Sequence, residues 1–179
     1  MEPASSSPRP ALIRRATLDD APTLAELGAR TFSETFLADN HPDDIAAFLA
    51  ATYGPSQQAA ELADAANHFL VAEREGVPVG YAKLRRGPAP SCVKGAAPIQ
   101  IDRLYVAREH LGRRVGEALM TRCLEEARVA AHQTVWLGVW ERNTRALAFY
   151  RRWGFCVVGE HTFQLGSDRQ NDLLMEREP

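Results

Sequence analysis

Two segments of the sequence hold residues whose types and spacing are typical of a binding or catalytic site. The first of them could bind an anion. Residues 104–119 run from a strand-like stretch through a basic, glycine-containing loop into a helix-like stretch. The first N–H groups of a helix lack internal partners and carry about half a positive charge, so this loop could hold a phosphate. Arg108, Arg113 and Arg114 would add cations there. The alternative interpretation is a tight turn with solvated arginines.

Two common phosphate-binding motifs are missing from the sequence. It contains no Gly-Lys-Ser/Thr of the Walker type and no Gly-x-Gly-x-x-Gly of the Rossmann type. Both motifs need glycines at fixed offsets, where the backbone approaches the phosphates. Their absence weighs against a nucleoside triphosphatase and against a NAD-dependent enzyme.

The second segment, residues 136–155, could form one wall of a ligand slot. Asn143 lies where a helix cap belongs. Asn143, Ala146 and Tyr150 have the spacing i, i+3, i+7, so they share one face of the helix that follows. A polar cap, a small residue and a phenol on one face suit a narrow ligand slot. The alternative is that Asn143 only caps the helix and Tyr150 packs in the core.

Hydrophobic periodicity predicts the elements that must position these segments. Helices are predicted after Thr17 through residues 24–32, and over 41–54, 56–65, 115–130 and 143–153. Strands are predicted at residues 11–16, 69–73, 79–84, 99–106, 134–140, 155–160 and 172–176. This order indicates an α/β fold, a mixed sheet with helices on its faces.

Length and charge restrict the class of protein. The chain has 179 residues, which at roughly 150 residues per domain predicts one domain. We assign that domain to residues 11–179, after a polar, Pro/Ser-rich N-terminal tail at residues 1–10. The net charge of −2 gives no bulk positive field for nucleic acid or an anionic membrane surface. The longest apolar run, residues 45–51, is far shorter than the roughly 20 residues of a membrane span. We therefore expect neither a nucleic-acid nor a membrane partner.

The spacing of the cysteines and histidines predicts neither a disulfide framework nor a metal site. Cys92, Cys123 and Cys156 are odd in number and widely spaced, so a reducing compartment, the cytoplasm, is expected. The five histidines show no HxxxH spacing, so no metal site is predicted.

Together, the two segments resemble the GNAT superfamily, the Gcn5-related acetyltransferases that use acetyl-coenzyme A. The loop of that family is Gln/Arg-x-x-Gly-x-Gly/Ala, and here it reads Leu-Gly-Arg-Arg-Val-Gly over residues 111–116. The final glycine matches. Leu111 replaces Gln/Arg, and Arg114 replaces the first glycine, although arginine tolerates a positive φ poorly. The more specific match is Asn143 followed by Ala-x-x-Phe-Tyr-x-x-x-Gly-Phe. The resemblance covers residues 13–175.

A narrower resemblance is to the PaiA-type bacterial branch, which is associated with acetylation of polyamines. It rests on Thr-Phe-Ser-Glu-Thr-Phe at residues 31–36, Val-Gly-Tyr-Ala-Lys-Leu at 79–84, and the segments 161–166 and 172–175.

The family resemblance implies a fold and a binding mode for acetyl-coenzyme A as cosubstrate. The fold is a mixed, mostly antiparallel central sheet with a splayed pair of central strands and helices on both faces. The exposed backbone of the splayed strand would bind the pantetheine arm, and the loop and helix N–H groups the pyrophosphate. The implied cofactor-binding residues are Leu104, Tyr105, Val106, Leu111, Gly112, Arg113, Arg114, Val115, Gly116, Glu117, Asn143 and Tyr150.

The resemblance also implies direct attack by the amine in a ternary complex, with Tyr150 as the general acid for the departing thiolate. Thiol and phenol pKa values lie within about 1.5 units of each other, so this proton transfer is matched. Many relatives carry a glutamate where this sequence has Gln100, which cannot take a proton. Asp102, two residues along the same strand face, is the predicted base, directly or through water. Its alternative role is a solvated carboxylate or an ion pair with an arginine.

The acceptor is expected to be a polyamine or a similar small primary amine. Its pocket should lie between the first two helices, the splayed strands and the last hairpin. The acids available there are Glu34, Asp39, Asp43, Asp44, Glu141, Asp168 and Asp172. Two alternatives stay open: a protein N-terminal or lysine acetyltransferase, and a non-catalytic acetyl-coenzyme A sensor. A homodimer is a further expectation.

Overall fold

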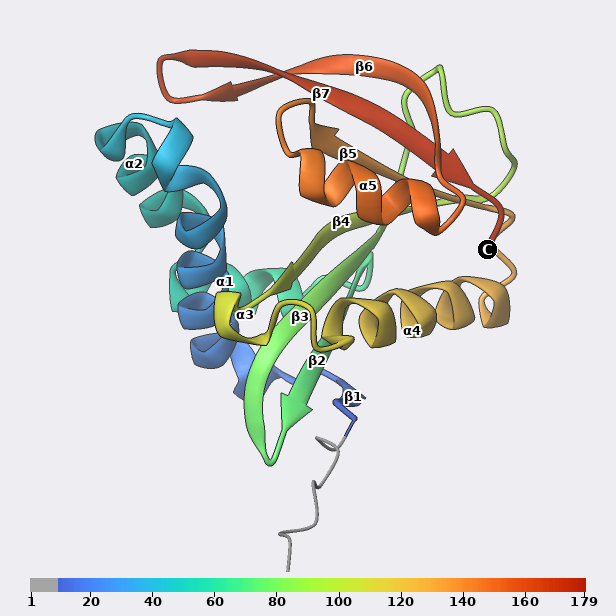
Figure 1. Ribbon diagram of the computed structural model, residues 1–179. Helices are drawn as coiled ribbons and strands as arrows, with labels where there is room; N and C mark the ends of the chain where they lie inside the picture. Colours follow the sequence, from blue (N-terminus) through green and yellow to red (C-terminus); the bar gives the residue numbers. More distant parts are fainter. Residues whose placement is uncertain (1–9) are drawn as a thin grey trace, which may run out of the picture.

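The computed structural model describes residues 10–179, in which seven strands form a single sheet (Figure 1). The strands are β1 (Leu12–Arg15), β2 (Asn67–Arg74), β3 (Val77–Arg86), β4 (Pro98–Val106), β5 (Thr134–Trp140), β6 (Cys156–Leu165) and β7 (Asp168–Arg177). Their order across the sheet is β1-β2-β3-β4-β5-β7-β6, and among these pairs only β4 and β5 run parallel. The predicted tail, residues 1–10, lies outside the described residues except for Pro10.

Helices cover both faces of the sheet. They are α1 (Ala21–Phe36), α2 (Pro42–Thr52), α3 (Pro55–Ala63), α4 (Val115–Val129) and α5 (Thr144–Arg152). Residues of α4 and α5 pack into one hydrophobic cluster, which includes Leu119, Tyr150 and Met175. Residues of α1 and α2 pack into a second cluster with Tyr81 and Leu165. The mixed, mostly antiparallel sheet between two helical layers is the predicted fold class.

The sheet opens at its centre, where the predicted pair of strands parts. The ladder between β4 and β5 has three pairs, the last of them Gln100 with Trp136. Beyond it, β4 continues to pair with β3 as far as Val106, and β5 continues to pair with β7 as far as Trp140. Figure 1 shows the two strands diverging, with α5 beside the opening. The backbone edge of β4 that faces β5 is therefore left without a strand partner.

A β-bulge marks the point of divergence. Lys83 pairs with Arg103 and Leu84 with Ile101, so Asp102 is an extra residue on β4. Such an insertion bends the bulged strand and increases its local twist. Because the bulge interrupts the alternation of side chains, Asp102 and its neighbour Arg103 both reach the same cluster of charges under α3.

The elements occur in the predicted order, and the largest difference is in the last hairpin. Strands were predicted at residues 155–160 and 172–176, whereas β6 and β7 meet at a tight turn around Gly166, with φ of 57°. Residues 161–171 are mainly polar and several are exposed. In this stretch Phe163 and Leu165 pack in the second cluster, but two apolar positions are too few to show the alternation by which strands are recognised, so the length of the strand could not be read from the pattern.

Candidate active site

A cavity of about 1000 Å³ follows the split between β4 and β5 and reaches across to α1, α2 and the β6–β7 hairpin. Most of the predicted site residues line it. They are Asp102, Leu104, Tyr105, Val106, Leu111, Gly112, Arg114, Gly116, Glu117, Asn143 and Tyr150. The side chains of two others lie elsewhere, because Val115 is buried in the core beneath α4 and Arg113 is exposed.

The loop before α4 adopts a conformation that glycine favours, although one of its residues is an arginine. Gly112 has φ of 74°, and Arg114, the N-cap of α4, has φ of 62° and ψ of 12°. A left-handed conformation costs an L-residue roughly 1–2 kcal/mol. Arg114 thus adopts the left-handed conformation that a glycine at this position would adopt without strain. The free N–H groups of the first helical turn still lie at the cavity.

A contact from α1 fixes the approach to this loop. The backbone N–H of Arg108 donates to Glu34 Oε2 at 2.9 Å, and the Arg108 guanidinium donates to the Glu34 carbonyl at 2.6 Å. Glu34 is also 3.9 Å from Arg30. Although Glu34 lines the cavity, its carboxylate is thus already engaged with the loop between β4 and α4.

Helix α5 contributes the phenol on the same side as the loop. As predicted, Asn143 caps this helix, and its Oδ1 accepts from the Ala146 N–H at 3.1 Å. Tyr150 is buried and makes edge-on contacts with Phe149 and Phe155, at centroid distances of 5.5 and 5.8 Å. Burial raises the pKa of Tyr150 above its usual value, with a smaller contribution from Cys123. The phenol therefore holds its proton at neutral pH while it lines the cavity.

Aromatic side chains form the opposite side of the cavity, and we call them the aromatic wall. Its members are Phe32, Phe36, Phe48, Tyr53, Tyr105, Trp140 and Phe163. Phe32 stacks on Phe48 with centroids 4.5 Å apart, and Phe36 lies 5.9 Å from Trp140. The negative faces of aromatic rings attract cations, by about 0.5–2 kcal/mol per contact. This side of the cavity suits an organic cation with an apolar chain.

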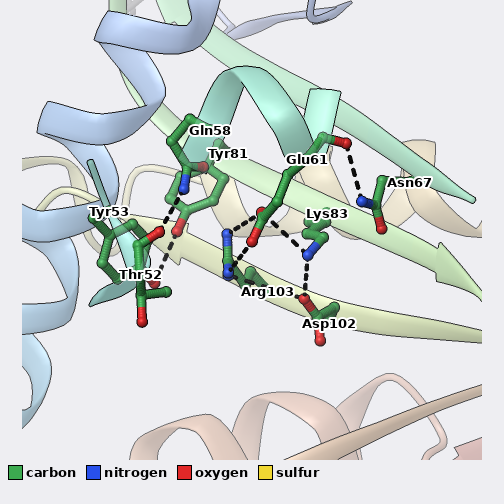
Figure 2. Close-up of polar contacts among 9 residues, drawn as sticks. All are labelled: Thr52, Tyr53, Gln58, Glu61, Asn67, Tyr81, Lys83, Asp102 and Arg103. Carbon is green, nitrogen blue, oxygen red and sulfur yellow. Dashed lines mark hydrogen bonds and ion pairs between the residues drawn. The ribbon is translucent and has the colours of Figure 1, made fainter. Parts of the chain in front are cut away.

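The predicted base, Asp102, lies in a partly buried network of four charges (Figure 2). Its Oδ2 is 2.9 Å from Lys83 Nζ, which is also 3.1 Å from Glu61. Arg103 binds Glu61 with both terminal nitrogens, at 2.8 and 3.0 Å. The side chain of Lys83 is only 5% exposed. The structure thus gives Asp102 a lysine as its close partner, and Gln100 lies in the paired part of β4, outside the cavity lining.

Of the seven acids expected around the acceptor, only Glu34 and Asp172 line the cavity. Glu34 holds the Arg108 loop, whereas the Asp172 carboxylate has no hydrogen bond or ion pair within the described chain. Burial raises the pKa of Asp172, and the nearby His161 lowers it in part. Asp172 lies beside Gly138 of β5, where an added Cβ would be 3.7 Å from Asp172 Oδ2.

Sequence reasoning did not single out Gly138 or assemble the aromatic wall. A glycine inside the strand Trp-Leu-Gly-Val-Trp was the available signal, because glycine in a strand interior often marks a close approach of another group. The wall combines residues from five elements, and no local pattern joins them.

A sheet that splits beside the N-terminus of one helix, with a protonated phenol from a second helix on the same side, fits an acyltransferase that uses an acyl-coenzyme A. The chain belongs to the acetyltransferase (GNAT) family, whose model matches residues 24–155. It is therefore an N-acetyltransferase that uses acetyl-coenzyme A as cosubstrate.

Its relatives agree with this assignment. The chain is 33% identical over 158 residues to an uncharacterised N-acetyltransferase of Lactobacillus delbrueckii subsp. lactis, covering 88% of this chain and 91% of that one. It is 35% identical over 161 residues to one from Mycobacterium bovis, covering 90% and 99%. In fold it is similar to a PaiA N-acetyltransferase from Thermoplasma acidophilum solved with coenzyme A, with a TM-score of 0.78, 20% identity, and coverage of 96% and 100%.

Two further findings concern the described residues. Within residues 10–179, no group of three or more His, Cys, Asp or Glu side chains is arranged to hold a metal ion. Nor does any helix in this range have the length and apolar character needed to cross a membrane.

Proposed function

We propose that the protein moves the acetyl group of acetyl-coenzyme A to the primary amine of a small molecule, with a polyamine as the first candidate. Attack is direct, in a ternary complex, and Tyr150 is the general acid. The observation that carries this proposal is the continuity of one cavity from the α4 loop and Tyr150 to the aromatic wall. Both substrates can meet in that cavity, which direct attack requires.

The chain's own groups fit acetyl-coenzyme A, which supplies the activated acetyl group. The unpaired edge of β4 at Leu104, Tyr105 and Val106 offers backbone donors and acceptors to an extended pantetheine arm. The first turn of α4 offers N–H groups to a pyrophosphate. An added Cβ at Gly116 would meet only ordinary contacts with Phe149 and Val106, at 3.7–3.9 Å. At Gly112 an added Cβ would meet nothing within 4 Å, so a phosphate can approach the backbone of the loop there.

On the acceptor side, a polyamine is supported by the kind of surface that it meets. Its ammonium groups are attracted by the aromatic wall and by the Asp172 carboxylate, and its methylene segments match the apolar rings. The PaiA resemblance favours the same class. The cytoplasm and a homodimer remain predictions and belong to this proposal.

A panel of amines tests the proposal, with release of coenzyme A thiol as the readout. The panel contains spermidine, putrescine, a monoamine with an alkyl chain, a peptide with a free N-terminus and a lysine peptide. We expect a small amine to be turned over with kcat/KM at least tenfold above either peptide. A peptide as the best substrate would favour the protein acetyltransferase instead.

A binding measurement separates the enzyme from a sensor. Acetyl-coenzyme A at 100 times its Kd should raise the unfolding free energy by about 2.7 kcal/mol, seen as a thermal shift. Stabilisation without turnover of any amine would favour the sensor, and no shift at millimolar concentration would contradict the whole proposal.

A further inference from the structure

Four carboxylates line the cavity, and Asp172 differs from the other three in its position and its partners. Glu34 holds the Arg108 loop and Asp102 is paired with Lys83. Glu117 lies in the first turn of α4, on the cofactor side. Asp172 is the carboxylate that faces the acceptor side without a cation partner in the described chain.

The geometry of β7 directs Asp172 to the side opposite the phenol. Leu173 and Met175 pack in the cluster beneath α4 and α5, the cluster that also holds Tyr150. Because side chains alternate along a strand, Asp172 points to the other face, where its cross-strand neighbour Trp140 contacts Phe36 of α1. Tyr150 and Asp172 therefore approach the cavity from opposite faces of the sheet.

Gly138 keeps the carboxylate accessible from the split. It lies two residues beyond Trp136, the last β5 residue paired with β4. Its missing side chain leaves open the space beside Asp172 Oδ2, which an added Cβ would approach to 3.7 Å. Every other position of β5 carries a side chain that is buried, whereas Gly138 is exposed to the cavity. An amine entering the split from the acceptor side meets Asp172 there.

We propose that Asp172 is the base that takes the proton from the acceptor amine. This inference rests on the proposed function, because it assigns a role within that reaction. Asp102 was the predicted base, but its carboxylate is bound by Lys83, which competes for the oxygen that would accept a proton. Asp172 has no hydrogen bond or ion pair in residues 10–179, and His161 acts on it only through its charge.

The electrostatic surroundings of Asp172 match this role. Burial raises its pKa, so its carboxylate binds a proton more strongly than an exposed one does. His161 on β6, the cross-strand partner of Asp172, is the charged neighbour that lowers this pKa in part. From the β5 side, Gly138 and Trp140 contribute no ionisable group. A base with a pKa nearer to neutrality removes a proton more effectively at physiological pH.

The proton and electron movements balance with these two side chains. The acceptor ammonium gives one proton to Asp172, and its freed lone pair forms the N–C bond to the acetyl carbon. The C–S bond breaks, and its electron pair leaves with the sulfur, which takes the phenolic proton of Tyr150. The nitrogen then loses its second proton, which restores the phenol, and Asp172 releases its proton to water. The products are an acetamide, a thiol and one proton.

The test compares wild type with Asp172→Asn on the most active amine of the panel. We expect kcat/KM to fall by about 10²–10⁴-fold, the usual contribution of a general base. The wild-type pH profile should have an acidic limb above the usual carboxyl range of about 3.9, and the variant should lack this limb. Replacing His161→Gln should move the limb to higher pH, because it removes the charge that lowers the Asp172 pKa.

Two measurements besides activity accompany the profile. Asp172→Asn should melt no lower than wild type, because the amide avoids the cost of a buried charge. Calorimetry in the presence of coenzyme A should show weaker binding of the protonated amine to this variant. Asp172→Glu should recover part of the lost rate. If Asp172→Asn does not fold, Gly138→Val covers the same carboxylate from β5, and the same loss of rate is expected.

Glu160→Gln is the matched control. Glu160 lies on the neighbouring strand, outside the cavity lining, and accepts from Asn171 Nδ2 at 3.0 Å, which a glutamine carbonyl can also do. The proposal is overturned if Asp172→Asn keeps the acidic limb and a rate within threefold of wild type, or if Glu160→Gln loses as much. If wild type acetylates no amine, the proposed function fails and this assignment fails with it. The two failures are distinguishable. The wild type remains an active enzyme if only the assignment of Asp172 fails, and it is inactive if the proposed function fails.

Discussion

The two sides of the cavity are built from different kinds of groups. The cofactor side consists mainly of backbone: the unpaired edge of β4 and the first turn of α4. The acceptor side consists of side chains: the aromatic wall and Asp172, with the Lys83 network behind it. A backbone surface survives sequence change as long as the chain keeps its path. A side-chain surface changes with every substitution.

Arg114 illustrates the tolerant side and Asp102 the sensitive one. The loop keeps its left-handed N-cap with an arginine in the position of the family's glycine. On the acceptor side, Lys83 forms an ion pair with Asp102. Asp172 has no such ion pair in the described chain, so its carboxylate is the one available to an amine. In the function we propose, the cofactor side identifies the family, whereas the acceptor side determines the substrate.

Among the side chains on the cofactor side, Tyr150 should contribute most to the rate of acetyl transfer. In Tyr150→Phe we expect kcat to fall by about 10²–10⁴-fold, because general acid assistance to the leaving thiolate is lost. Packing is kept, so the melting temperature and the Kd of acetyl-coenzyme A should change little. Steady-state rates and a melting curve on the same sample measure both. An unchanged kcat would remove Tyr150 from the mechanism.

Lys83 tests how strongly the acceptor side depends on its buried charges. Lys83→Met leaves Glu61 and Asp102 with one shared arginine, and breaking such a buried arrangement costs about 3–5 kcal/mol. Denaturant unfolding measures this loss. The control is Arg122→Met: Arg122 pairs with Glu126 one turn along α4 and its side chain is 41% exposed, so at most about 1 kcal/mol is expected. Equal losses in the two variants would contradict a special role for burial.

Gly116 tests whether the cofactor side binds a phosphate. Gly116→Glu places a carboxylate at the first turn of α4, where a diphosphate would compete with it for the same N–H groups. Acetyl-coenzyme A affinity should fall by about 10–100-fold, or about 1.4–2.8 kcal/mol. Calorimetry measures the affinity, and Gly116→Ala, whose Cβ meets only ordinary contacts, is the control for added bulk. Equal affinities in Gly116→Glu and wild type would show that no phosphate lies there.

Arg114 should give the smallest effect. Arg114→Gly removes the strain of a left-handed arginine, which stabilises the fold by roughly 1–2 kcal/mol. It also adds backbone freedom to the unfolded chain, which destabilises the fold by roughly 0.5–1 kcal/mol. We expect a net gain of about 0.5–1 kcal/mol in the unfolding free energy. Acetyl-coenzyme A affinity should fall less than tenfold, because the N–H groups remain. Arg114→Ala removes the same guanidinium but keeps the strain, so it should show no gain; a gain there too would mean that the strain is not the cause.

The sequence by itself determined the features that depend on neighbours in the chain. The Asn143 cap, the apolar face of α4 and the order of helices and strands follow from contacts a few residues apart, which a local pattern records. The loop before α4, residues 111–117, could be located for the same reason, since helix N-termini present N–H groups wherever they occur; that it binds the cofactor is our proposal.

Only the tertiary structure decided that Asp102 is ion-paired and that Asp172 is not. Asp102 and Asp172 are both acidic residues on strands, and nothing in their local sequence distinguishes them. The bulge in β4 and the pairing with β3 bring Lys83 to Asp102, while β5 presents a bare glycine to Asp172. The charge and the burial of a side chain depend on groups that lie far away along the chain, so the fold decides which of the two carboxylates is ion-paired.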